Sequence, residues 1–507
     1  MFSRLNTVSF QGIDVITIEA QVQISSGIPG FSIVGLPDKA VAESKERVRS
    51  AFHSMGLSLP YQRITVNLAP ADVQKEGSHY DLPIALGLLS AMKIIPSDCL
   101  EDFVALGELS LDGRLAPISG VLPAAIHASS LEKGLICPRI CGGEAAWAGE
   151  ITILAADTLL SLLNHFKGTQ VLSPPEPQLE KDNTFSMLDL RDVKGQETAK
   201  RALEIAAAGG HNLLMLGPPG AGKSMLAARL PGILPPLTPS EALEVTMIQS
   251  LAGRLNEGKL IKTRPFRDPH HSASMPALVG GGLKTQPGEI SLAHHGVLFL
   301  DELPEFARAA LEALRQPLES GKTIIARANS HVSYPSRVQL IAAMNPCRCG
   351  YISDASRACS RAPKCAIDYQ SKISGPLFDR IDLHVDVPAL KHDELTGIPQ
   401  GESSAQIRAR VNKAREVQLK RFEDLQNVFC NAHMESKQIR EYCKINADGE
   451  SILKMAVQRL GLSARAYDRI LKVARTIADM EGQEHIGSSQ LCEAIQYRSL
   501  DRSLAMR

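Results

Sequence analysis

An eight-residue segment near the middle of the chain most strongly limits what this protein can fold into. The segment reads Gly217-Pro218-Pro219-Gly220-Ala221-Gly222-Lys223-Ser224. It follows the largely apolar run 212–216, and a G-x-x-x-x-G-K-[S/T] pattern between a strand and a helix is typical of a phosphate-binding loop. Its glycines let backbone N–H groups close around phosphate oxygens, and the next helix adds its positive end. The sequence therefore predicts a nucleoside triphosphate site, in which Lys223 contacts the β- and γ-phosphates and Ser224 holds Mg²⁺.

Composition places few further limits on the protein. The 507 residues suffice for about three domains, and a hydrophobic content of 44% with 22% charged residues is ordinary for a globular protein. The N-terminus does not resemble a signal peptide, and the apolar stretch 84–92 is too short to cross a bilayer. We therefore expect a cytoplasmic protein without membrane contact. The 55 basic and 55 acidic residues cancel, so any DNA contact must be local.

Three domains are expected along the chain. Prolines and charged residues mark 170–185 as a linker. The preceding residues, 1–169, alternate β-rich and helical runs, which predicts an α/β or α+β domain. Residues 186–390 carry the nucleotide-binding motifs, and 391–507 show only helical periodicity. The clearest expected strands are 15–23, 31–34, 63–68 and 151–155, and the clearest expected helices are 39–54, 407–425 and 465–480.

A second motif supplies acidic groups for hydrolysis. The apolar run 297–300 suits a central parallel strand covered on both faces, and it is followed directly by two carboxylates. Asp301 is expected to organise the Mg²⁺ shell together with Ser224. Glu302 is expected to orient and deprotonate the attacking water. The alternative is a strand end with two solvated acids, which the phosphate loop upstream makes the weaker interpretation.

A third motif completes the order of the site. The apolar run 338–344 ends at Asn345 and Pro346, so the amide would stand at the tip of a neighbouring strand, near the attacking water or the γ-phosphate. An Asn before Pro is otherwise a common turn former. The order of phosphate loop, carboxylate strand and Asn strand is typical of AAA+ ATPases.

Several longer strings resemble the ComM/YifB family of magnesium-chelatase-related AAA+ ATPases. They are residues 192–196, 206–211, 288–296, 314–319 and 374–383, and the similarity extends over residues 1–500. This resemblance implies a Lon-protease-like α+β N-terminal domain, a central P-loop αβα core and a C-terminal helical lid. It also implies ATP and Mg²⁺ as ligands, a homo-hexameric ring, and helicase or branch-migration activity on single-stranded and branched DNA. The implied processes are homologous recombination and natural transformation, with recombination proteins as further partners.

The same resemblance assigns roles to two arginines. Arg380 matches the arginine finger that enters the ATP site of a neighbouring subunit, where a fixed positive charge stabilises the transition state. Arg465 matches the sensor-2 arginine of the helical lid. Without the resemblance, both would be read as ordinary surface or ion-pair arginines.

Two segments are candidates for DNA contact. Residues 264–284 are rich in Gly and Pro and predict a projecting, mobile loop, which in related proteins faces the pore of the ring. Residues 322–333 read as a hairpin ahead of the Asn345 strand, where related helicases grip the DNA backbone. The candidate phosphate contacts are Lys284, Lys322 and Arg327. The paired histidines His270 and His271 are interpreted as loop hydrogen-bonding residues, because no third metal ligand accompanies them.

Four cysteines fall within a short polar stretch after Asn345. They are Cys347, Cys349, Cys359 and Cys365. The spacing is not that of a standard zinc ribbon, yet four thiols in such a loop can form a tetrahedral zinc site that supplies the stabilisation a small core lacks. The alternative is four reduced thiols in an exposed loop. The remaining six cysteines are scattered and are expected to be core or surface thiols.

The N-terminal domain is not expected to be a peptidase. Residues 107–120 resemble part of the Lon protease domain, but alignment of the glycines puts His79 at the nucleophile position. The stretch 121–125 contains no lysine to activate a serine, although Ser78 lies one residue away. Two other functions stay open: a protein-remodelling or Lon-like peptidase ATPase, and the motor subunit of a magnesium-chelatase-type enzyme. The first would need an aromatic pore grip and the second a separate catalytic subunit.

Overall fold

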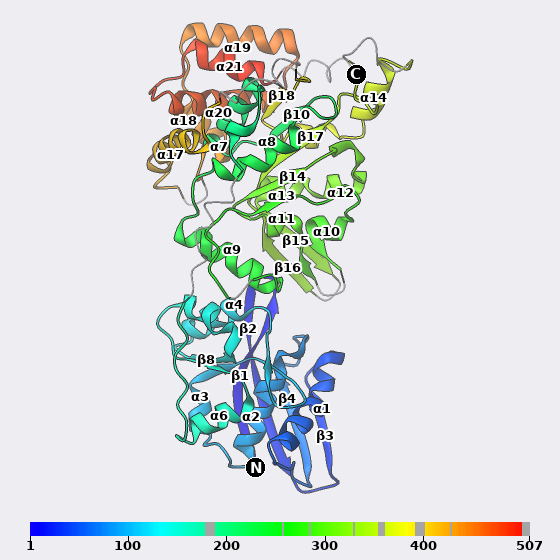
Figure 1. Cartoon of the computed structure of the whole chain (residues 1–507), viewed down its shortest axis with the longest axis vertical. Coiled ribbons are helices and arrows are strands. Elements are labelled where there is room, and N and C mark those ends of the chain that lie inside the picture. Colours follow the sequence, from blue (N-terminus) through cyan, green and yellow to red (C-terminus); the bar gives the residue numbers. More distant parts are fainter. Residues whose placement is uncertain are drawn as a thin grey trace. The chain divides into compact units, whose positions relative to one another are not determined.

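The computed structural model describes residues 1–177, 188–255, 258–282, 285–327, 330–352, 360–390, 401–425 and 428–498 (Figure 1). The chain forms two compact units that do not follow its order. Unit 1 contains Met1–Lys181, Pro239–Lys262 and Ile324–Tyr334, and unit 2 contains Asp182–Thr238, Thr263–Thr323 and Pro335–Arg507. Unit 1 therefore includes two segments, Pro239–Lys262 and Ile324–Tyr334, that are flanked in the sequence by parts of unit 2.

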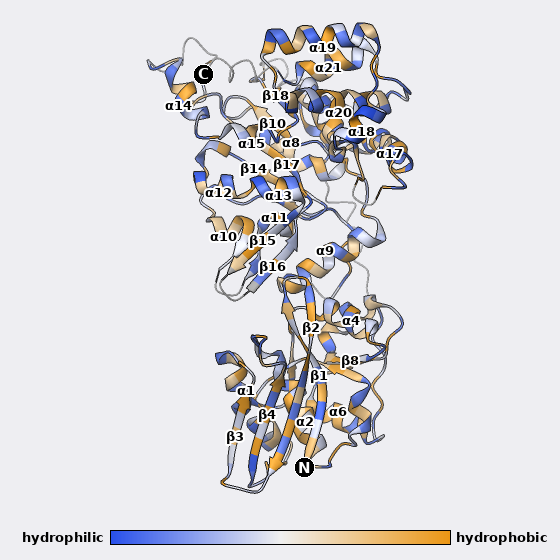
Figure 2. Ribbon diagram, turned by 180° about the vertical axis from the view of Figure 1, so that it is seen from behind, coloured by the Kyte–Doolittle hydropathy of each residue, from blue (hydrophilic) through white to orange (hydrophobic). Residues whose placement is uncertain are grey.

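A seven-stranded mixed sheet forms the centre of unit 1, in the order β3-β4-β2-β1-β5-β8-β9. The strands are β1 (Phe2–Gln11), β2 (Asp14–Ser25), β3 (Gly30–Val34), β4 (Arg63–Ala69), β5 (Phe103–Ala105), β8 (Gly134–Pro138) and β9 (Ile153–Ala156). β1 and β2 are an antiparallel hairpin, whereas β5, β8 and β9 run parallel. Hydrophobic and polar residues alternate along β2 and β4 (Figure 2), so one face of each strand packs into the core.

Helices cover this sheet. They are α1 (Lys39–Ser54), α2 (Asp81–Ala91), α3 (Asp98–Glu101), α4 (Val121–Ser130), α5 (Gly142–Ala145) and α6 (Leu159–Phe166), and β6 (Glu108–Leu109) and β7 (Leu115–Ala116) form a small separate ladder. The side chain of Asp38 caps α1 by accepting a 2.7 Å hydrogen bond from the Val41 amide. Every residue of α2 is buried. The predicted mixed α/β composition is confirmed, as are the predicted strands and the 39–54 helix; the likeness to Lon stays a prediction.

Helix α9 (Pro239–Leu251) packs on α4 within unit 1. The buried carboxylate of Glu144 accepts a hydrogen bond from the Leu122 amide at 2.9 Å and another from the Ser250 hydroxyl. The Gly120 amide donates to the Ser250 carbonyl at 3.1 Å. Burial raises the pKa of Glu144. One buried carboxylate thus joins the start of α4 to the end of a helix that the sequence places between the two nucleotide-binding motifs.

β15 (Lys322–Arg327) and β16 (Ser330–Pro335) form a two-stranded sheet in the stretch where a hairpin is expected. The turn between β1 and β2 lies against β16, because a Cβ atom on Gly12 would stand 2.6 Å from the Ser333 carbonyl oxygen. Gly12 has a φ of 69°, which favours glycine at this close approach.

A five-stranded parallel sheet forms the centre of unit 2, in the order β11-β14-β17-β10-β18. The strands are β10 (Leu213–Leu216), β11 (Phe266–Arg267), β14 (Val297–Leu300), β17 (Gln339–Met344) and β18 (Leu383–Asp386), and all four neighbouring pairs are parallel. β10, β14 and β17 are buried along their whole length, as their continuous apolar sequences predict. Their carboxyl ends meet at one edge, where open parallel sheets bind ligands.

Helices and one small ladder precede or connect these strands. They are α7 (Glu197–Gly209), α8 (Lys223–Arg229), α10 (Met275–Val279), α11 (Glu289–Leu292), α12 (Arg308–Ala313), α13 (Arg315–Ser320), α14 (Lys364–Gln370) and α15 (Gly375–Phe378), with β12 (Gly280–Gly281) and β13 (Gln286–Pro287) as a small ladder. The projecting loop predicted at 264–284 is wrong for Phe266 and Arg267, which form β11 of the main sheet. Phe266 stacks on Phe299 with ring centroids 6.0 Å apart, and this packing holds the segment in the core.

The C-terminal part of unit 2 is helical, as predicted. It contains α17 (Ser404–Arg421), α18 (Ser436–Tyr442), α19 (Ala447–Leu460), α20 (Ala464–Met480) and α21 (Ser488–Gln496). The N-cap of α17 is Ser403, which forms a capping box with Gln406. Helix α7 packs against both α17 and α20, so the helical part and the sheet share one hydrophobic core.

Asp382 ties the sheet to this helical part through buried polar contacts. It accepts a hydrogen bond from the Asn212 amide at 3.1 Å, lies 3.3 Å from His211 Nδ1 and pairs with Arg469 of α20. His211 in turn lies 2.8 Å from the hydroxyl of Thr476. Burial opposes ionisation of Asp382, yet Arg469 and His211 hold its pKa well below the usual range. The helical part is therefore attached to the sheet by charge as well as by apolar packing.

Candidate nucleotide-binding site

The glycine-rich loop forms an open cradle between β10 and α8. Gly220 and Gly222 have φ values of 76° and 91°, and a Cβ atom added to either would meet nothing within 4 Å. At Gly217, by contrast, a Cβ would stand 2.1 Å from the Val387 carbonyl oxygen. The loop thus needs glycine for close packing on one side and for backbone shape on the other. Pro218, Pro219 and Ala221 complete the loop, and its open side fits a phosphate chain.

Lys223 lies at the start of α8 and turns back over the loop. Its ammonium donates hydrogen bonds to the carbonyls of Gly217 at 2.8 Å and Pro218 at 2.9 Å, and to Asn345 Oδ1 at 3.1 Å. Burial lowers the pKa of Lys223, and the carboxylates of Asp301 and Glu302 act in the opposite direction. Three oxygen acceptors therefore hold the lysine against the loop and against the tip of β17.

Ser224 and Asp301 form an oxygen-donor pair suited to magnesium. Ser224 Oγ donates to Asp301 Oδ2 at 2.6 Å, across from α8 to the end of β14. Magnesium prefers oxygen ligands and keeps several waters, so one hydroxyl and one half-buried carboxylate fit it well. The donor set thus agrees with the predicted role of both residues.

Glu302 follows Asp301 in a constrained conformation. Its φ is 52°, in the left-handed region, which costs energy for a residue with a side chain. The Glu302 amide donates to Asp301 Oδ1 at 2.8 Å, so both oxygens of the Asp301 carboxylate are bound, one by this amide and one by Ser224. Lys223, Ser224, Asp301, Glu302 and Asn345 are therefore brought to one edge of the sheet.

The site also includes Asp268, which the sequence did not indicate, and His271, for which only a hydrogen-bonding role within its loop was predicted. His271 Nδ1 lies 3.4 Å from Glu302 Oε2, and the pKa of Asp268 is raised by burial and by the nearby carboxylate of Asp301. Both follow β11, which pairs with β14 so that Arg267 is opposite Leu298. A two-residue strand is too short to detect by periodicity. The hydrogen-bonding role predicted for His270 is confirmed, because its Nδ1 lies 2.8 Å from the Ser272 hydroxyl.

The two arginines predicted from the resemblance lie apart from this cluster. Arg380 follows α15 and contacts α13 and its own turn: it donates to the Arg315 carbonyl at 3.0 Å and to the Pro376 carbonyl at 2.6 Å, and it pairs with Glu319. Arg465 is exposed in the first turn of α20. Among these contacts of the described residues, neither arginine binds a residue of the phosphate loop of its own chain.

The candidate DNA contacts are only partly described. Lys322 is exposed and begins β15, and Arg327 ends the same strand. Lys284 lies outside the described residues.

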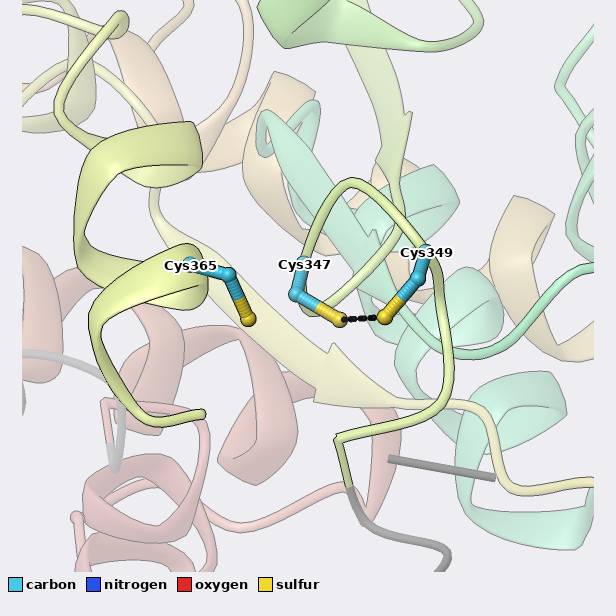
Figure 3. A group of neighbouring side chains, drawn as sticks. All are labelled: Cys347, Cys349 and Cys365. Carbon is cyan, nitrogen blue, oxygen red and sulfur yellow. Dashed lines mark hydrogen bonds between the residues drawn. The ribbon is translucent and has the colours of Figure 1, made fainter. Parts of the chain in front are cut away.

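Three of the four clustered cysteines are described. The sulfur atoms of Cys347, Cys349 and Cys365 all lie within 4.8 Å of one another (Figure 3). Cys359 lies outside the described residues. The other six thiols behave as predicted: Cys137, Cys141, Cys430 and Cys443 are buried, Cys99 is half-buried and Cys492 is exposed.

The N-terminal serine is engaged by an acid. Ser78 Oγ donates to a carboxylate oxygen of Glu108, and the buried His79 has its Nε2 2.9 Å from the Val8 carbonyl oxygen. A buried lysine that the sequence did not single out, Lys75, lies three residues before Ser78. Its ammonium donates to the Pro70 carbonyl, and burial lowers its pKa. In the described contacts, Ser78 is thus paired with a carboxylate and the nearby lysine with a backbone carbonyl.

A phosphate loop, two carboxylates after a central strand and an Asn after the next strand of a parallel sheet define a P-loop ATPase of the AAA+ class. The family described as "Magnesium chelatase, subunit ChlI" matches residues 189–395, "Subunit ChlI of Mg-chelatase" matches 20–140, and "Magnesium chelatase, subunit ChlI C-terminal" matches 401–498.

Two of the similar proteins cover nearly the whole chain, and a third covers about a third of it. "Competence protein ComM" of Haemophilus influenzae is 47% identical over 97% of this chain and 96% of that protein. "Uncharacterized protein YifB" of Escherichia coli is 44% identical over 99% of this chain and 98% of that protein. The "Magnesium-chelatase 38 kDa subunit" of Rhodobacter capsulatus is 25% identical over 35% of this chain and 56% of that protein. The chain belongs to the ComM/YifB family of magnesium-chelatase-related AAA+ ATPases, for which ATP and Mg²⁺ are the implied ligands.

Among the described residues, the helices are all too short or too polar to span a membrane.

Proposed function

We propose that this protein is a ring-forming AAA+ ATPase that moves DNA strands, extending heteroduplex by helicase or branch-migration activity. The observation that carries the proposal is a site that brings Lys223, Asp301 and Asn345 together, within a chain that is similar over 97% of its length to a competence protein. Integration of incoming DNA into a duplex requires one strand to be exchanged against existing base pairs. A motor driven by ATP is suited to this work.

The ATP site supports hydrolysis through its own side chains. Lys223 would exchange the carbonyls of Gly217 and Pro218 for phosphate oxygens, which are stronger partners for an ammonium. Glu302 would accept the proton of the attacking water, and Asn345 would orient that water or the γ-phosphate. Ser224 and Asp301 would hold Mg²⁺, which would neutralise the charge that develops on the phosphates.

A hexameric ring is proposed because the site is incomplete in one chain. Arg380 would act on the ATP of a neighbouring subunit, leaving Glu319 and the carbonyls that hold it here. Arg465 of α20 would report on the nucleotide from the helical part of the chain. Hydrolysis would then depend on assembly, since a stabilising charge arrives only with a second subunit.

DNA contact is proposed for the β15–β16 hairpin and the segment before β13. Lys322, Arg327 and Lys284 would bind phosphates, which positions the strand without reading its sequence. Because the chain has no net charge, contact would be local, and six copies of these residues around a pore would add up to strong salt dependence. Single-stranded and branched DNA, and recombination proteins that deliver them, are the proposed partners of a cytoplasmic enzyme.

The alternative functions have less support. A peptidase would need a serine activated by a base, whereas Ser78 donates to Glu108 and Lys75 to Pro70. A chelatase motor is favoured by the family descriptions alone, and the chelatase subunit is similar over only 35% of this chain. Zn²⁺ has no part in the proposed hydrolysis. Its expected ligands are the clustered cysteines, and no cysteine is among the residues proposed to bind or hydrolyse ATP.

Strand movement on a four-way junction or a three-strand DNA substrate tests the proposal. The full-length protein with ATP is expected to move strands, and Lys223→Ala and Glu302→Gln are expected to abolish this movement. Lys322→Ala should weaken DNA binding about equally for all sequences and reduce its salt dependence, while ATP binding is unchanged. An ATPase activity that is indifferent to every DNA structure, with no strand movement, would contradict the motor function and leave only the ATPase.

A further inference from the structure

We propose that Cys347, Cys349 and Cys365 form a thiolate site for zinc, and that this metal fixes the loop after β17 against the phosphate loop. The site goes beyond the proposed ATP-driven motor. It stands on the geometry of three sulfur atoms and on the contacts of the loop that carries two of them.

The three thiols come from two separate stretches of chain and point toward one another. Cys347 and Cys349 lie on the loop that follows β17, and Cys365 lies in the first turn of α14 (Figure 3). The sulfurs of Cys347 and Cys349 are 3.1 Å apart, and all three lie within 4.8 Å of one another. Cys347 is fully buried and the other two are half-buried. The cluster is therefore enclosed on one side and open to an incoming ion on the other.

These distances suit a tetrahedral metal. Zinc–sulfur bonds of about 2.3 Å place neighbouring sulfurs roughly 3.8 Å apart in a tetrahedron, so movements below about 1 Å would complete the geometry. Soft thiolates select zinc over magnesium or calcium, which prefer oxygen. The three described thiols leave one position of the tetrahedron for a further ligand.

The surroundings explain why a metal would be useful here. The loop contacts α14 through a hydrogen bond from Gln370 Nε2 to the Pro346 carbonyl at 2.9 Å. Thiols form weak hydrogen bonds among themselves, whereas a zinc–thiolate site contributes folding energy directly. A metal would join the loop and α14 much more firmly than the thiols alone.

The loop also contacts the nucleotide site. Gly350 is buried at a φ of 84°, and a Cβ atom there would stand 2.4 Å from Pro219 Cδ. Asn345, two residues before Cys347, accepts a hydrogen bond from Lys223. Metal bound at the cysteines would therefore fix two neighbours of the phosphate chain, Pro219 and Asn345, from outside the site.

Metal analysis of the untagged full-length protein tests the site. We expect about one equivalent of zinc per chain, lost in Cys347→Ser and Cys365→Ser and kept in Cys492→Ser, which alters an exposed thiol of α21. Cys349→His should keep the metal, since imidazole is also a zinc ligand. Cobalt uptake should give the charge-transfer absorption of thiolate ligands. Zinc-free protein that gives no such absorption, or zinc retained in both serine variants, would overturn the proposal.

A second measurement separates the site from its effect and does not need the variants to fold. Titration of wild-type protein with a mercurial should release zinc as the clustered thiols react, and should weaken binding of a fluorescent ATP analogue several-fold. Cys492→Ser should behave as wild type throughout. Zinc release without any change in nucleotide affinity would refute the link to the phosphate loop while leaving the metal site. Loss of DNA strand movement alone would bear on the motor function instead.

Discussion

His271 Nδ1 lies 3.4 Å from Oε2 of Glu302, the carboxylate expected to activate water. The contact crosses from the end of β11 to the end of β14, and it involves a glutamate whose backbone is held at a φ of 52°. A histidine in this place can hold the carboxylate in one direction until the nucleotide arrives. We therefore expect His271 to position this carboxylate.

The first prediction concerns this contact. His271→Gln should lower kcat for ATP hydrolysis about tenfold, equivalent to about 1.4 kcal/mol, with little change in the Kd for ATP, because the substitution frees Glu302 without touching the phosphate loop. The matched control is His270→Gln, which alters the neighbouring ring that contacts Ser272. Equal effects of the two substitutions, or a change confined to KM, would rule out positioning of Glu302.

The second prediction separates binding from hydrolysis. Lys223→Ala should abolish binding of a fluorescent ATP analogue, because the ammonium that would contact the phosphates is lost. Glu302→Gln should keep the analogue bound and lower kcat by about a hundredfold or more, since only the base is removed. Titrations and steady-state rates on the same preparations give both numbers. Normal turnover in Glu302→Gln would place the catalytic base elsewhere.

The third prediction tests whether the site is shared between subunits. Arg380→Ala should lower the ATPase rate by about a thousandfold if the arginine acts as a finger. Mixing Arg380→Ala with Glu302→Gln should restore part of the activity, because some interfaces then combine an intact glutamate with an intact arginine.

Glu319→Gln provides the control for Arg380. It breaks the contact within the chain while leaving the guanidinium in place, so hydrolysis should be kept or increased. If the mixture is as inactive as its two components, Arg380 does not act across an interface.

The fourth prediction concerns the buried carboxylate that joins the sheet to the helical part. Asp382→Asn should lower the free energy of unfolding by about 3 kcal/mol, since Arg469 loses its buried partner. The pKa of Asp382 is depressed in the folded protein, so its stabilising effect is present above the ordinary aspartate pKa of about 3.9 and is lost as pH falls further.

Thermal unfolding of wild type and Asp382→Asn across pH measures this effect. The difference in Tm should be largest at neutral pH and should shrink below about pH 4. Glu402→Gln is a suitable control, because Glu402 pairs with Arg410 at the surface and surface pairs contribute little. A Tm difference that grows on acidification would contradict the assigned charge state.

Local sequence was sufficient for much of the fold. Helix 39–54 begins at the cap Asp38 and is found with the same bounds, and the continuous apolar runs before Gly217, Asp301 and Asn345 became buried parallel strands. Long periodic segments and buried apolar runs are specified by residues close together in the chain. The polar residues that follow two of these strands, Asp301 and Asn345, were predictable for the same reason.

Contacts between distant residues were not predictable in this way. β11 consists of two residues that read as part of a loop, and it is a strand because it pairs with β14 and stacks Phe266 on Phe299. His271, Asp268 and the buried Glu144 acquire their surroundings only through that kind of pairing. Periodicity carries no information about which strand or helix a short segment will meet.

The sequence by itself predicted the phosphate loop with Lys223 and Ser224, the two carboxylates that follow an apolar run, and a group of four cysteines within 19 residues. Tertiary structure alone decided that His271 meets Glu302 and that Gly350 packs on Pro219. It also decided that α9 packs on α4 through Glu144. The physical reason is that loop glycines and strand ends act through the local backbone. These tertiary contacts instead join residues that are about 30 to 130 positions apart in the chain, and only the folded core brings such residues together.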